Sequence, residues 1–121
     1  MTLRNLIRID GAAALASGCA VLLALPWISS WTGLPPTVLG KMAAVSLGYA
    51  ACSFTLSTRV AIRPFFVSAL ATANSLWALV CLGVIFAFDP TAFGRLYLAG
   101  EAAFVAGLAI AEWKRSHATV I

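Results

Sequence analysis

The chain has 121 residues, of which 62% are hydrophobic and 10% are charged, and its mean hydropathy is +0.98. Soluble domains carry about a quarter charged residues, so this composition excludes a water-soluble globular protein. The formal charge of +4 comes from basic residues at the ends of apolar runs, which indicates orientation in a membrane and not binding to nucleic acid.

Four apolar segments are long enough to cross a bilayer as helices. A hydrocarbon layer about 30 Å thick needs about 20 helical residues, and a helix satisfies its own backbone hydrogen bonds in lipid. We therefore predict an all-α protein, a four-transmembrane-helix bundle that forms a single transmembrane domain over residues 1–121. The expected spans are residues 6–25, 37–56, 64–88 and 90–113.

The first span has to be distinguished from a signal peptide. Asp10 interrupts its start, and no small-residue cleavage site precedes Pro26, so we expect the span to be retained. The connection over residues 26–35 contains Trp27 and Trp31, which predicts an anchor at the lipid–water interface. A lid over a substrate is the alternative.

Prolines mark the starts of the next three spans. Pro36, Pro64 and Pro90 can each occupy the first turn of a helix, where a missing N–H costs nothing. Asp89 is expected to cap the fourth helix.

The basic residues are distributed unequally between the two sides of the expected bundle. By the positive-inside rule this bias predicts a multi-pass protein of the inner (cytoplasmic) membrane with both termini in the cytoplasm. The side of the termini has Arg4, Arg8, Arg59, Arg63, Lys114 and Arg115, and the opposite side has Lys41 and Arg95.

A pattern of Pro, Thr, an apolar residue, Gly and a basic residue occurs twice, in residues 36–42 and 90–96. Ile7-Arg8 and Ile62-Arg63 repeat at nearly the same offset. These matches predict a duplicated two-helix hairpin. Alternatively, two similar loops each require Pro, Gly and a cation independently.

Glu101 lies near the middle of the fourth span, where an ionised carboxylate is costly unless it is paired or neutralised. It is either a proton-binding or cation-coupling group, or a hydrogen-bonded carboxyl that fixes helix packing. We expect Asn74, Tyr97 and Trp77 to form an ion- or substrate-binding site with it. Trp77 either packs against small residues or stacks on a ligand.

Asp10 lies just inside the first span, at about the depth of several basic residues. We expect it to form a structural ion pair, with Arg63 as the partner.

Known catalytic and metal-binding motifs are missing from the sequence, so we expect a non-enzyme without cofactors. The one histidine, His117, follows the last span, and the cysteines Cys19, Cys52 and Cys81 fall in three different apolar runs as small apolar residues. A thiol-based redox role has the least support.

Three short stretches resemble a group of uncharacterised small bacterial membrane proteins. They are the loop Gly33-Leu34-Pro35, the turn Arg63-Pro64 and the segment Asn74-Ser75-Leu76-Trp77. The resemblance implies a four-helix integral membrane fold and does not imply an activity.

Two functions follow from these patterns. The first is a non-enzymatic membrane component, either a homo-oligomer or a subunit of a larger membrane complex, because stripes of small residues such as Ala44-x3-Gly48 and Ala103-x3-Gly107 favour close helix contacts. The alternative is a small proton- or cation-coupled transporter or channel that uses Glu101. A cavity that reaches this carboxyl would favour the alternative.

Overall fold

The computed structural model describes the backbone of residues 2–120 and the side chains of residues 2–115, and every regular element in this part is an α-helix. Four helices, counting α5 to Arg115, are long and apolar enough to cross a membrane, which confirms the predicted fold class. The elements are α1 (Leu3–Leu23), α2 (Leu25–Thr32), α3 (Pro36–Ser57), α4 (Pro64–Phe88) and α5 (Ala92–Val120).

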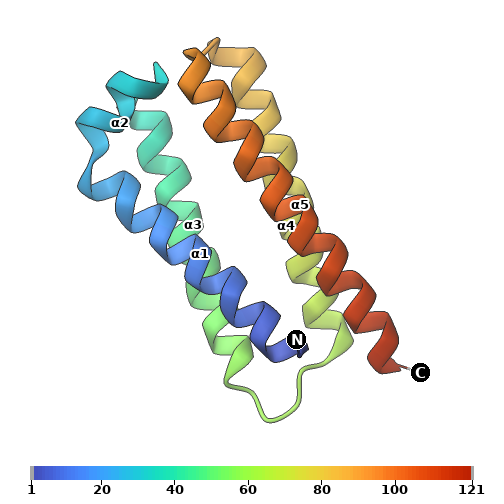
Figure 1. Ribbon diagram of the computed structural model, residues 1–121. Helices are drawn as coiled ribbons and strands as arrows, with labels where there is room; N and C mark the ends of the chain where they lie inside the picture. The colour runs from blue at the N-terminus through green and yellow to red at the C-terminus, as the bar shows by residue number, and fades with distance from the viewer. Residues whose placement is uncertain (1, 121) are drawn as a thin grey trace.

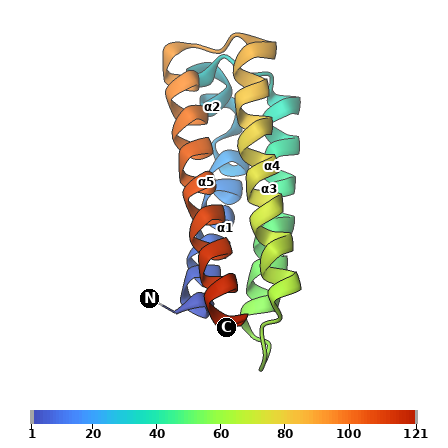
Figure 2. The same ribbon diagram turned by 90° about the vertical axis from the view of Figure 1, so that its right-hand side faces the viewer.

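The long helices form two antiparallel pairs. Helix α1 packs along α3, and α4 packs along α5, whereas the two pairs contact each other much less (Figure 1). Helix α1 begins and α5 ends beside the α3–α4 connection, at what we call the terminal end of the bundle (Figure 2). Helix α2 and the α4–α5 connection lie at the opposite end, the α2 end.

This pairing is what a duplicated hairpin would produce, but the duplication itself stays a prediction. The two repeated motifs begin their helices differently. Pro36 is the first residue of α3, whereas in the second motif α5 begins only at Ala92, after Pro90 and Thr91.

Two of the three proline-marked starts are found where the sequence places them, since Pro36 and Pro64 are the first residues of α3 and α4. At the third, Asp89 ends α4 in a left-handed conformation (φ 45°) and forms an exposed ion pair with Arg95. The expected cap by Asp89 is replaced by Thr91, whose Oγ1 accepts from the backbone N–H of Gly94 at 3.2 Å.

The connection expected over residues 26–35 contains the short helix α2. Pro26 lies in the first turn of α2 and does not end the first span, since α1 already ends at Leu23. Gly33 terminates α2 with a φ of 72°, a conformation that glycine adopts without steric cost. Trp27 and Trp31 are 63% and 56% exposed, as an interfacial anchor requires.

Helix α2 also joins the two helix pairs. The backbone N–H of Thr91 donates to the Thr32 carbonyl at 3.0 Å, and its hydroxyl donates to the Trp31 carbonyl. Gly94 is buried against this contact, where an added Cβ would overlap the Thr32 carbonyl oxygen. Only glycine fits at this approach of α5 to α2.

Apolar clusters close the bundle at both ends. The cluster at the α2 end contains residues of every long helix, among them Val21, Leu39, Val84 and Leu98. The cluster at the terminal end consists of Ile7, Leu56, Val67 and Leu70. Between these two clusters the helix pairs leave a cavity.

We expect Gly94→Ala to lower the free energy of unfolding by about 1–3 kcal/mol, because the new methyl group overpacks the contact with Thr32. Gly100→Ala on the same helix is the matched control, since a Cβ there meets nothing within 4 Å. Thermal unfolding in detergent, followed by circular dichroism, measures both. Equal melting temperatures for the two variants would contradict this account.

Candidate functional site

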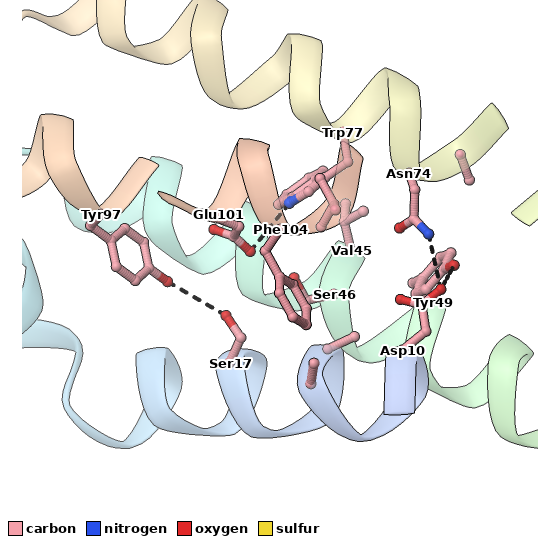
Figure 3. A pocket seen from close by; sticks show the side chains of 14 residues that line it. Asp10, Ser17, Val45, Ser46, Tyr49, Asn74, Trp77, Tyr97, Glu101 and Phe104 are labelled. Atoms are coloured by element: carbon pink, nitrogen blue, oxygen red, sulfur yellow. Dashed lines mark hydrogen bonds between the residues drawn. The ribbon is translucent and has the colours of Figure 1, made fainter. Parts of the chain in front are cut away.

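A cavity of about 330 Å³ lies between the two helix pairs and is lined by all four long helices. No basic side chain is among its lining residues in the described part of the chain. Its polar and aromatic walls are shown in Figure 3 and include Asp10, Tyr49, Asn74, Trp77, Tyr97 and Glu101.

Short side chains leave the space for this cavity. Ala13, Ala14 and Ala73 line it, so these alanines do not all serve the close helix contacts that their spacing favours. Gly18 does allow a close helix contact, since an added Cβ would lie 2.8 Å from Cγ of Leu47 on α3. Small residues therefore have two roles here, close packing within a helix pair and open space between the pairs.

Glu101 lies in the half of the cavity toward the α2 end. Trp77 on α4 donates from Nε1 to Oε1 of Glu101 at 3.3 Å. The hydroxyls of Tyr97 on α5 and Ser17 on α1 form a hydrogen bond of 3.5 Å nearby (Figure 3). The structure thus brings together three of the four residues expected at the site, Glu101, Trp77 and Tyr97.

Asn74, the fourth expected residue, belongs to a second group toward the terminal end. Its Nδ2 donates to Oδ2 of Asp10 and to Oε1 of Glu112, each at 2.9 Å. Tyr49 donates its hydroxyl to the same Oδ2 of Asp10. Each long helix contributes one residue to this group, which we call the polar tetrad: Asp10, Tyr49, Asn74 and Glu112.

The tetrad is shielded from its surroundings. Asp10 is 2% exposed, Asn74 3% and Glu112 0%. Three of its residues line the cavity, whereas Glu112 lies behind Asp10 and Asn74 and is not part of the wall. Two carboxyls are therefore buried around one amide at one end of the cavity, and a third carboxyl, Glu101, stands on its wall.

The structure does not bring Asp10 and Arg63 together as an ion pair. Arg63 is exposed at the N-cap of α4, while Asp10 faces the interior, where it binds Tyr49 and Asn74. Helix α1 starts at Leu3 and not at residue 6. Asp10 therefore lies about two turns inside the helix, deeper than the expected span of residues 6–25 places it.

Glu112 is the site residue that sequence reasoning missed. It lies next to Lys114 and Arg115 at the end of the fourth span, a position that is typical of residues at the lipid–water interface. One signal could have identified it: Glu112 follows Glu101 by about three helical turns, which places both carboxyls on the same face of α5.

The other reactive side chains do not gather into a site. Cys81 is buried and Cys19 and Cys52 are exposed, all three as free thiols. Among the described residues, no group of three or more His, Cys, Asp or Glu side chains could hold a metal ion. The side chain of His117 lies outside the described residues.

Comparisons with protein-family models, with curated proteins and with solved structures gave no match. The resemblance to small bacterial membrane proteins therefore stays a prediction, and the cavity is the feature that bears on function.

We expect Asn74→Leu to lower the free energy of unfolding by about 2–5 kcal/mol, because it removes both amide hydrogen bonds and leaves two buried carboxyls with fewer donors. Ser75→Ala is the control, since the Ser75 hydroxyl donates to the Ala71 carbonyl within its own helix and so bridges no helices. Reversible unfolding in mixed detergent micelles measures both. A loss for Asn74→Leu no larger than that for Ser75→Ala would contradict the bridging role.

Proposed function

We propose that the protein binds lipophilic organic cations in its central cavity and exchanges them for protons across the membrane. The cavity that reaches Glu101 is the observation that carries this proposal. It favours the transporter alternative over a purely structural membrane component, for which an open space with carboxyls in its wall serves no purpose.

The lining of the cavity suits a cation. Asp10 and Glu101 supply carboxyls where the dielectric is low, so their attraction for a positive charge is much stronger than in water. The rings of Trp77, Tyr97 and Phe104 also line the cavity, and the faces of aromatic rings attract cations. An anion would meet carboxyls and no basic group among the described lining residues.

The volume and openness of the cavity suit an organic molecule. About 330 Å³ lies at the lower end of the range for small-molecule sites. Val45 and Phe104 in its wall are 56% and 49% exposed, so these side chains do not seal the cavity. An apolar ligand that has partitioned into lipid can enter between the helices.

Exchange follows from the cost of charge in the membrane. When a cation leaves the cavity, the carboxylate that faced it stays in an apolar environment, and a proton from water can neutralise it. Cation and proton then compete for the same negative charge. We expect the apolar clusters at the two ends to act as barriers, so that opening at either end would give access to one side.

The proposal includes the membrane location and the partners of the protein. It is a non-enzymatic protein of the cytoplasmic membrane with both termini in the cytoplasm, as the excess of basic residues at the terminal end suggests. The lipid bilayer is its first partner. Large apolar side chains such as Phe86 and Leu96 are exposed on its surface. A second copy or a larger membrane complex would bind to this lipid-facing surface.

We expect Glu101→Gln to weaken binding of the probe cation ethidium at least about tenfold, or about 1.4 kcal/mol, because the amide keeps the shape of the side chain and removes its charge. Asp89→Asn is the control, since it removes a carboxyl that is exposed outside the cavity. Ethidium fluorescence polarisation with the purified protein in detergent measures both affinities. Absence of binding to the wild type, or equal binding by Glu101→Gln, would refute the proposal.

A further inference from the structure

The polar tetrad contains two carboxyls, and its hydrogen bonds do not offset the negative charge that both would carry when ionised. Asp10 and Glu112 accept from the same amide nitrogen, so their carboxyls lie close together. Both are almost completely buried. The groups that donate to them, the Asn74 amide and the Tyr49 hydroxyl, are neutral. Two ionised carboxylates at such a distance would repel each other strongly.

One oxygen of the tetrad also lacks a partner. Glu112 Oε2 is buried and accepts no hydrogen bond from the described residues. An unpaired carboxylate oxygen is costly at such a site. Because both carboxyls accept from the same amide nitrogen, a proton on Glu112 Oε2 removes the charge of that carboxyl and turns the oxygen into a donor beside Asp10. A proton therefore satisfies the orphaned oxygen and removes one of the two charges.

Among the side chains that the structure describes, none supplies a positive charge to the pair in its place. On α1, the Arg4 guanidinium donates to the carbonyls of Ser57, Arg59 and Val60 in the connection after α3. On α3 the nearby side chains are Tyr49 and Ser53. The Ser53 hydroxyl is buried and has no hydrogen-bond partner among the described residues. The remaining basic side chains near the terminal end are exposed: Arg8, Arg59, Arg63, Lys114 and Arg115.

We infer that Asp10 and Glu112 together bind one proton at the terminal end of the cavity, and that this pair releases its proton when a cation binds to the exchanger. The second half of this inference rests on the proposed function, and the first half does not. A proton from water adds to a carboxylate oxygen, forms one O–H bond and changes the charge of the pair from −2 to −1.

The position of the pair explains how it would couple to a cation. Asp10 forms part of the cavity wall, whereas Glu112 lies behind it. A cation in the cavity stabilises the ionised form of Asp10 and so favours release of the shared proton. When the cation leaves, the pair takes up a proton again. The two ligands thus exclude each other through one carboxyl that contacts both.

Infrared spectroscopy tests the proton site without any cation. The chain has four Asp and Glu residues, so the double variant Asp89→Asn with Glu101→Gln retains Asp10 and Glu112 as its only carboxyl side chains. At neutral pH we expect its protonated-carboxyl C=O band at about one third of the amplitude reached in acid, because one of the two side-chain carboxyls is protonated at neutral pH, whereas acid also protonates the other one and the terminal carboxyl of the chain. The band should disappear when Asp10→Asn and Glu112→Gln are added.

Absence of the band in the double variant at neutral pH, or a band there of about two thirds of the acid amplitude or more, would overturn the shared proton. If the quadruple variant does not fold, the double variant alone decides, since no other carboxyl side chain remains in it.

Proton release tests the coupling. In weakly buffered detergent solution we expect the wild type to release about one proton for each ethidium bound, and Glu112→Gln to release less than half as many per ethidium bound. An unchanged ratio in Glu112→Gln would overturn the coupling role of the pair. A wild type that does not bind ethidium would refute the proposed function, while the infrared result would still decide the proton site.

Discussion

The Nδ2 atom of Asn74 is hydrogen bonded to carboxyls on two other helices and thereby joins α1, α4 and α5 near the terminal end of the bundle. In lipid the hydrophobic effect does not drive helices together, so packing and polar contacts must hold them. With the Tyr49 hydroxyl on Asp10, every long helix is tied to this point. The tetrad therefore joins all four long helices at the terminal end of the cavity.

A second contact, at the α2 end, complements the tetrad. The backbone and hydroxyl of Thr91 bind the last carbonyls of α2, and Gly94 allows α5 to approach them. The two helix pairs are thus joined near their ends and separated in the middle. Short side chains such as Ala13 and Ala73 line that middle, so the separation persists as a cavity.

The chemistry of the cavity divides between two groups of residues. Glu101 and the aromatic rings around it offer a cation a charged and polarisable surface. In the proposed exchange, Asp10 and Glu112 share one proton away from the centre of the cavity. Asp10 belongs to both groups, because it lines the cavity and accepts from the same Asn74 amide nitrogen as Glu112. Competition between cation and proton would then act through the charge of this residue.

Much of the fold could be predicted from the sequence, because hydrophobic length and proline positions act locally. The four apolar runs gave the number of spans, and Pro36 and Pro64 gave two helix starts. Glu101, Trp77 and Tyr97 could be named as site residues because polar groups stand out in an apolar span. Helix α2 could not, because the two tryptophans of residues 26–35 indicate a connection at the lipid–water interface and carry no helical pattern.

What the amino-acid sequence determined by itself was an all-α membrane protein with costly carboxyls inside it, since lipid penalises every unpaired polar group wherever the chain crosses. Only the tertiary structure decided the partners of those carboxyls. Asp10 meets Asn74 and Glu112 instead of Arg63 because helices distant in the sequence turn particular faces toward each other. Those faces are set by packing over the whole bundle, which no local pattern records.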